Sequence, residues 1–90
     1  MILRMYSIFD AGVGAYTPPF PARADGEAVR SFKMTLLDQA HPMAKSPQDY
    51  SLARVGLFDD SNGQMSPLPA PEPMVTAQAV LAALKVTPEE

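Results

Sequence analysis

The sequence predicts an α+β fold, in which two strand-turn-strand-helix (ββα) units form a mostly antiparallel four-stranded sheet with helices on one face. The main observation is a short motif that occurs twice at a constant offset of 49 residues: Phe9-Asp10, Gly14 and Pro18, then Phe58-Asp59, Gly63 and Pro67. Each copy follows a strand-like apolar segment and precedes a segment with apolar residues at helical spacing. The pattern indicates a structural duplication within one domain, residues 1–86, with pseudo-repeats at about 2–40 and 51–85.

The first unit begins with a strand from Ile2 to Phe9, which mixes aliphatic and aromatic residues, and a turn from Asp10 to Gly14. A short return strand through Tyr16 is expected, because the prolines at 18, 19 and 21 lack amide donors and end the pairing early. Alternation places Tyr6 and Ile8 on one face with Arg4, and Leu3, Met5 and Phe9 on the other. Both faces are therefore substantially apolar.

A helix is expected from an N-cap at Asp25 to about Gln39. Val29, Phe32 and Leu36 give it one apolar stripe. The pair His41-Pro42 ends the helix, because a residue before proline is biased out of the helical region.

In the second unit, residues 42–49 are expected to form a loop and residues 50–58 a strand in which Leu52 and Phe58 share a face, like Leu3 and Phe9. The Asn-Gly pair that precedes Gln64 favours a hairpin turn, followed by a short return strand at residues 64–65. The alternating prolines at 67, 69, 71 and 73 predict a stiff, extended connector. Ala77, Val80, Leu81 and Leu84 then predict a second helix, and residues 87–90 a frayed tail.

Composition indicates a small, folded, loop-rich domain. The chain has 90 residues, of which 47 % are hydrophobic and 19 % charged, with ten prolines. Because a core of this size is marginal, we expect a homodimer that covers leftover apolar surface. No segment has the length of a membrane span or of a secretory h-region, so we expect a soluble cytoplasmic protein with no membrane partner.

The chain lacks the patterns of common catalytic and metal sites. With no cysteine there is no disulfide, thiolate nucleophile or sulfur-ligated metal. The single histidine, His41, is interpreted as an ordinary loop residue, and the acidic segment 59–63 as a hairpin turn rather than a calcium loop. No nucleophile elbow or phosphate-binding glycine loop occurs. We therefore expect no enzymatic activity, cofactor or metal.

Aromatic residues near basic ones indicate a candidate site for single-stranded nucleic acid, whose bases stack on rings while cations contact phosphates. The net charge of −3 means that such binding requires a local basic patch. The alternative is structural: Tyr6, Phe9 and Phe58 are expected in the core, and Arg30 and Lys33 can form an ordinary solvated helix face. The candidate phosphate contacts are Arg4, Arg23, Arg30, Lys33 and Arg54, and the candidate stacking rings are Tyr16, Phe20 and Tyr50.

Several stretches in order resemble the small nonstructural protein of gokushovirus-type microviruses, which are icosahedral phages with single-stranded DNA genomes. They are Met5-Tyr6-Ser7-Ile8-Phe9-Asp10, Pro18-Pro19-Phe20, the segment from Asp25 to Phe32, the run from Pro47 to Leu52, and the segment from Val55 to Gly63. The resemblance extends from about Met5 to Pro69. It implies a DNA-binding phage protein of the host bacterial cytoplasm that assists single-stranded genome synthesis and packaging.

Two functions are therefore expected in different classes. The first is a DNA-binding accessory protein that uses the candidate phosphate contacts and stacking rings. The second is a dimeric adapter that contacts the replication initiator or procapsid proteins and binds DNA little or not at all. Basic residues gathered on one surface would favour the first, and dispersed basic residues the second.

Overall fold

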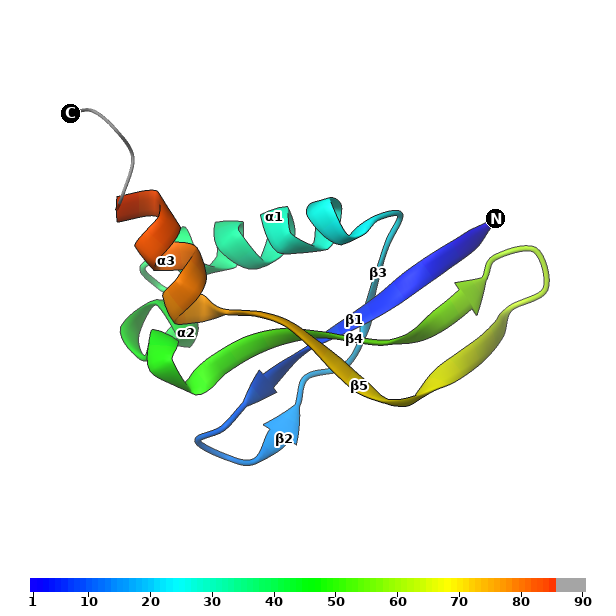
Figure 1. Ribbon diagram of the computed structural model, residues 1–90, viewed down its shortest axis with the longest axis horizontal. Helices are drawn as coiled ribbons and strands as arrows, with labels where there is room; N and C mark the ends of the chain where they lie inside the picture. Colours follow the sequence, from blue (N-terminus) through cyan, green and yellow to red (C-terminus); the bar gives the residue numbers. More distant parts are fainter. Residues whose placement is uncertain (86–90) are drawn as a thin grey trace.

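The computed structural model describes the backbone of residues 1–85 and the side chains of residues 1–83, so the expected tail at 87–90 and the side chain of Leu84 lie outside the described part. The elements in chain order are β1 (Ile2–Asp10), β2 (Ala15–Tyr16), β3 (Phe20–Ala22), α1 (Asp25–Leu37), α2 (Pro42–Lys45), the short 3-10 helix η1 (Pro47–Asp49), β4 (Tyr50–Asp59), β5 (Gln64–Thr76) and α3 (Ala77–Lys85). The α+β class is confirmed, and Figure 1 shows the strongly twisted sheet with α1 and α3 near one end of it.

The sheet is antiparallel throughout and has five strands, one more than expected. Its order is β2-β1-β4-β5, and β3 pairs with the same edge of β1 as β2 does, but nearer the N-terminal end of β1. The extra strand is β3, which contains Pro21. Proline is tolerated there because β3 is an edge strand, whose outward positions have no hydrogen bond to lose.

The proline segment 67–73 is extended as expected, but it is not a connector after a short return strand, because these residues belong to the 13-residue strand β5. This strand is also at an edge of the sheet, and its pairing with β4 is interrupted between Glu72 and Pro67. The alternating prolines therefore remain in extended geometry beside β4 without needing a complete ladder. The expected loop at 42–49 is also wrong, since it contains α2 and η1.

The two turns of the repeated motif have the same geometry. Gly14 and Gly63 have φ values of 71° and 78°, and each donates its N–H to the carbonyl of the aspartate four residues earlier, at 2.8 Å. In both turns the aspartate carboxylate accepts the amide two residues on, at 2.9 Å. Positive φ explains why glycine occupies both positions. The repeat is thus a pair of equivalent turns, and duplication of the complete ββα unit stays a prediction.

The core lies where the helices meet the sheet face that carries Tyr6, Ile8 and Leu52. The buried residues of this cluster are Tyr6, Ala22, Ala28, Phe32, Leu36, Met43, Leu52, Ala77 and Val80. Every helix α1 to α3 therefore contributes at least one fully or nearly fully buried side chain, and burial of these faces stabilises the helices.

A bulge in β4 changes the expected side-chain orientation. Tyr6 is opposite Arg54 and Met5 is opposite Gly56, so Val55 is an extra residue. Leu52 consequently lies opposite Ile8 on the core face, whereas Phe58 lies opposite Leu3 on the other face. The expectation that Leu52 and Phe58 share a face is wrong for this reason.

Candidate nucleic-acid interface

The turn from β3 into α1 brings two arginines close together in the fold. Arg4 is directly opposite Ala22 in the β1–β3 pair, so Arg23 continues from a position beside Arg4. Both arginine side chains are exposed. The backbone N–H of Arg23 donates to Glu27 Oε1 at 2.7 Å, which fixes the entry into α1. Two guanidinium groups therefore extend from one corner of the molecule.

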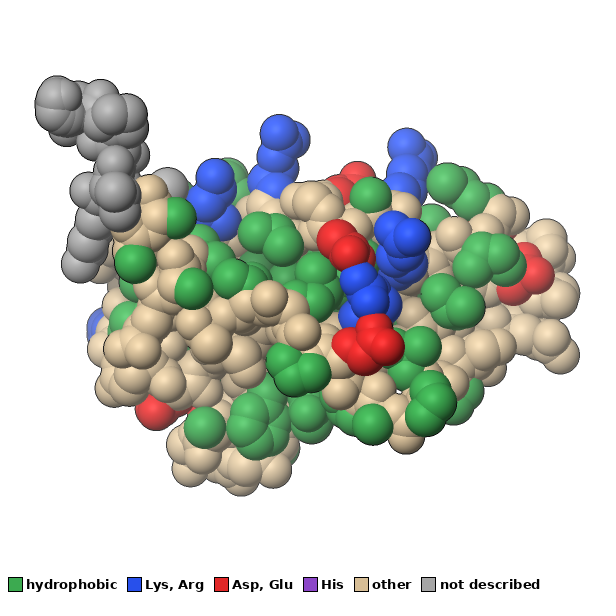
Figure 2. Space-filling view, in the orientation of Figure 1, with side chains coloured by type: hydrophobic (Ala, Val, Ile, Leu, Met, Phe, Trp, Pro, Cys, Tyr) green, Lys and Arg blue, Asp and Glu red, His purple; other side chains and the backbone are tan. Residues whose placement is uncertain are grey.

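Helix α1 adds two further cations to this side of the molecule. Its buried stripe consists of Ala28, Phe32 and Leu36, while Arg30 is exposed and Lys33 is half-buried. Figure 2 shows Lys and Arg side chains gathered along the side on which α1 runs. We call Arg4, Arg23, Arg30 and Lys33 the α1 basic surface.

Arg54 differs from these four because two carboxylates hold its guanidinium. Nη2 donates to Asp25 and Nη1 donates to Glu72. The pKa of Arg54 is raised by the hydrogen bond to Asp25 and then by the one to Glu72. Arg54 therefore connects β4 to α1 and β5, and its charge is already neutralised.

Asp25 is a hub of the same cluster and not the expected N-cap. The N-cap is Ala24, which makes no side-chain cap hydrogen bond, and Asp25 is the first helical residue. Asp25 Oδ1 accepts the hydroxyl of the buried Tyr6 at 2.7 Å. The hydrogen bonds from Tyr6 and from Arg54 lower the pKa of Asp25, while burial is the main cause that raises the pKa of Tyr6.

The three candidate stacking rings do not form one platform. Tyr16 is 48 % exposed and packs on Phe9 at a centroid distance of 4.8 Å, on the sheet face opposite the core. Phe20 is half-buried on the core side, with its ring centroid 6.0 Å from that of Tyr6. Tyr50 is half-buried against the core, and burial is the first cause that raises its pKa. Of the three, Phe20 lies in the strand that leads directly into the α1 basic surface.

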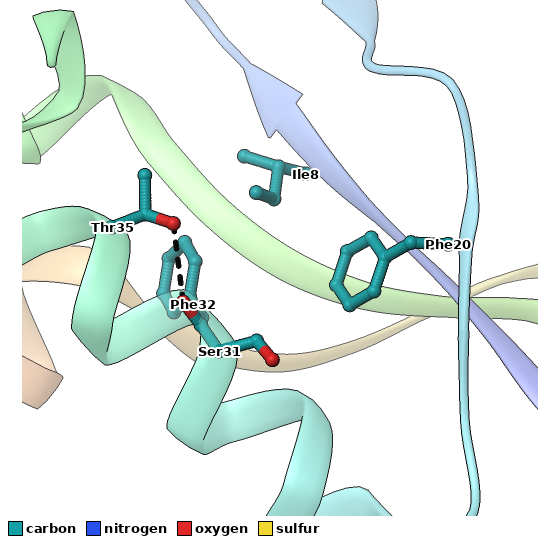
Figure 3. Close-up of a pocket in the computed structure, with 5 residues that line it drawn as sticks. All are labelled: Ile8, Phe20, Ser31, Phe32 and Thr35. Atoms are coloured by element: carbon teal, nitrogen blue, oxygen red, sulfur yellow. Dashed lines mark hydrogen bonds between the residues drawn. The ribbon is translucent and has the colours of Figure 1, made fainter.

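A pocket lies between α1 and the strands beside Phe20. Its volume is about 180 Å³, and it is lined by Ile8, Phe20, Ser31, Phe32 and Thr35, as Figure 3 shows. Thr35 Oγ1 donates to the carbonyl of Ser31 at 3.1 Å, so one hydroxyl is used within the helix. Among the described residues, no hydrogen bond involves Ser31 Oγ, and that side chain is exposed.

The profile of the family described as phage ORF5 protein matches residues 3–80. The chain belongs to the phage ORF5 protein family. This assignment agrees with the phage family that the resemblance implied. No curated protein and no solved structure matches the chain.

All eight candidate residues lie within the span that matches the phage ORF5 family. The structure gathers Arg4, Arg23, Arg30 and Lys33 around α1 and places Arg54 in an ion-pair cluster. It separates Tyr16 from Phe20. The pocket residues Ser31 and Thr35 were not candidates, although hydroxyls four residues apart beside an apolar helix stripe were a usable signal.

In this phage ORF5 family chain, the single histidine, His41, lies between α1 and α2. His41 lies in the bend before α2, outside the helices, and is the N-cap of α2, where its Nδ1 accepts the N–H of Met43 at 3.2 Å. Within residues 1–85, no group of three metal-ligating side chains occurs and no helix is long and apolar enough to cross a membrane.

Proposed function

We propose that this phage ORF5 family member is a non-enzymatic, nonstructural protein of a gokushovirus-type microvirus that binds single-stranded DNA in the host bacterial cytoplasm. Through this binding it assists single-stranded genome synthesis and packaging. The observation that carries the proposal is the α1 basic surface, in which Arg4, Arg23, Arg30 and Lys33 come from three separate segments of an acidic chain.

The acidic net charge is compatible with this site because much of it lies elsewhere. Asp59 and Asp60 are in the β4–β5 turn, and Asp10 is at the β1–β2 turn. Interactions between exposed charges are largely screened beyond about 10 Å at 0.1 M salt. A phosphate beside α1 therefore interacts mainly with Arg23, Arg30 and Lys33 and with the nearby Glu27, whereas Asp59, which is opposite Ile2, lies close to Arg4.

The test is fluorescence anisotropy with labelled single-stranded and double-stranded oligonucleotides over a range of salt concentrations. If all four cations contact phosphates, a plot of the logarithm of the binding affinity against the logarithm of the salt concentration has a slope of about −3. The double variant Arg23→Gln/Arg30→Gln reduces this slope to about −1.5. The matched control is Lys45→Gln on α2, which leaves the slope unchanged.

Absence of salt-dependent binding at micromolar protein would reject the proposal. An equal loss of slope in the Lys45→Gln control would also contradict it, because binding would then depend on total charge and not on the α1 basic surface.

A second function, a dimeric adapter for phage replication or procapsid proteins, is favoured by a different surface. Residues 1–4, 56–59 and 64–67 form a three-stranded projection, which Figure 1 shows extending beyond the helices. Met1, Ile2, Leu57 and Met65 in it are between 38 % and 63 % exposed. Exposed apolar surface of this kind marks interaction sites. A pull-down that recovers the replication initiator or procapsid protein without DNA would support the adapter.

A further inference from the structure

The pocket beside α1 has an apolar floor and a polar rim. Phe32 is 1 % exposed and forms the floor with Ile8, while the half-buried Phe20 ring forms one wall. Ser31 and Thr35 of α1 form the opposite wall, and Figure 3 shows Phe20 across the pocket from them. A ligand that enters the pocket therefore meets an aromatic wall on one side and hydroxyls on the other.

The volume restricts what can enter. Small-molecule sites usually have volumes of about 300 to 1,000 Å³, whereas this pocket has about 180 Å³. An apolar cavity of about 150 Å³ accepts a benzene ring. The pocket therefore has room for one flat ring of a ligand, and the rest of the ligand lies outside the pocket.

The chain on either side of the pocket supplies positive charge. Arg23 follows Phe20 by three residues along β3 and the turn into α1, and Arg30 is adjacent to Ser31 on α1 but about 100° round the helix from it, on the solvent side. Both arginines are exposed. A ring attached to a chain of phosphates therefore fits this surface better than an isolated apolar side chain does.

We propose that the pocket receives one nucleobase of the single-stranded DNA that lies along the α1 basic surface. The base stacks on Phe20, and Ser31 Oγ hydrogen-bonds to its edge, while Arg23 and Arg30 contact the flanking phosphates. This inference rests on the proposed function and adds to it the place where a base is held. Stacking accepts every base, so binding is expected to depend weakly on sequence.

The experiment compares an oligothymidylate with an abasic strand of the same length, which keeps the phosphates and lacks the bases. Wild-type protein is expected to bind the abasic strand about tenfold more weakly, since one stacked base is lost. The variant Ser31→Phe fills the pocket mouth and binds oligothymidylate about tenfold more weakly than wild type does, with an unchanged salt slope. The control is Ser66→Phe, an equal change at an exposed position of β5, which binds like wild type.

The possible failures are distinguishable. If neither strand binds wild-type protein in a salt-dependent way, the proposed function itself fails. If wild type binds both strands equally, or if a folded Ser31→Phe binds oligothymidylate like wild type, DNA binding stands and the nucleobase pocket is rejected. The strand comparison uses only wild-type protein, so equal binding of the two strands rejects the nucleobase pocket even if Ser31→Phe does not fold. Loss of self-association in Ser31→Phe without loss of DNA affinity would assign the pocket to a second copy of the chain and overturn the inference.

Discussion

Asp25 and Arg54 show how two residues predicted for other roles connect four parts of the fold. Asp25 starts α1, Tyr6 comes from β1, Arg54 from β4 and Glu72 from β5. Arg54 Nε is buried without a hydrogen-bond partner among the described residues, so the cluster satisfies most but not all of its donors. Removing one partner of such a cluster leaves buried polar groups without a hydrogen bond. The resulting loss of folding free energy is larger than the net contribution of the hydrogen bond itself.

Tyr6→Phe is expected to lower the free energy of unfolding by about 1.5 to 3 kcal/mol, because it removes a hydrogen bond to a charged group from a fully buried ring. Urea denaturation followed by circular dichroism measures the change. The matched control is Tyr16→Phe, whose ring is 48 % exposed and which is expected to change stability by less than about 0.5 kcal/mol. Equal effects of the two substitutions would contradict the assigned role of the Tyr6 hydroxyl.

The same cluster predicts a pH dependence. The pKa of Asp25 is lowered by the hydrogen bonds from Tyr6 and Arg54, so its contribution to stability is present above its unfolded pKa of 3.8 and is lost as the pH falls below that value. Urea denaturation between about pH 5 and 3 is expected to show a smaller fall in stability for Asp25→Asn than for wild type. The remaining fall is assigned to Asp59, whose pKa is lowered by its hydrogen bond from the Ser61 hydroxyl. An identical pH dependence in wild type and Asp25→Asn would show that the cluster does not contribute in this way.

Among the elements, strand β4 depends on close approach to β5 next to its bulge. A Cβ atom added to Gly56 would lie 2.8 Å from the carbonyl oxygen of Ser66 and 3.3 Å from Cα of Pro67. These are backbone atoms, which cannot move without separating the two strands. The glycine therefore permits the register on which the projection depends.

Gly56→Ala is expected to destabilise the fold by about 1 to 3 kcal/mol through this overpacking. The matched control is Gly26→Ala in the first turn of α1, where the added methyl group has no atom within 4 Å apart from its chain neighbours and the backbone of its own helix. That substitution is expected to be neutral or to stabilise by up to about 1 kcal/mol, since alanine favours the helix. Thermal unfolding measures both, and equal effects would show that β5 is not in close contact at this position.

The elements that the sequence predicted well are those with a local physical cause. The strand β1, the helix α1 and both glycine turns follow from alternation, an apolar stripe and positive φ. The bulge at Val55 has no such local signal, because it depends on how β4 pairs with its neighbours. The proline-containing strands also lack a local signal, because only their tertiary position at an edge of the sheet allows extended pairing. The ion pairs of Arg54 with Asp25 and Glu72 likewise depend on tertiary contacts. For the candidate site, the cations of α1 were therefore predictable from their positions in the sequence, whereas the ion pairing of Arg54 and the pocket depended on tertiary contacts.

At the scale of the whole molecule, the three-stranded projection carries apolar side chains on both faces. Leu3 and Phe58 are paired with each other on one face, with Met65 beside them, and Leu57 lies on the other. A sheet with apolar residues on both faces is normally covered on both. We therefore expect a second copy of the chain to cover the projection.

Met65→Glu is expected to shift such a dimer toward monomer, because it places a charge in the apolar interface. Sedimentation velocity over a range of protein concentrations measures the shift. The matched control is Met34→Glu on α1, which changes a similarly exposed methionine, 63 % against 57 %, outside the projection. A wild-type protein that is monomeric at every concentration would contradict the expectation.

The prolines at the two edges of the sheet have a consequence for how such copies can be arranged. Prolines occupy positions 67, 69, 71 and 73 in β5 at one edge, and Pro21 interrupts the donors of β3 at the other. A strand from another copy can pair with an exposed edge only where backbone N–H donors are regularly spaced along it. Proline lacks this donor, so the prolines at both edges disfavour growth into an open-ended filament. Association of two copies through the same face instead gives a closed, twofold pair. The edge prolines therefore favour a finite assembly, even where the protein is concentrated.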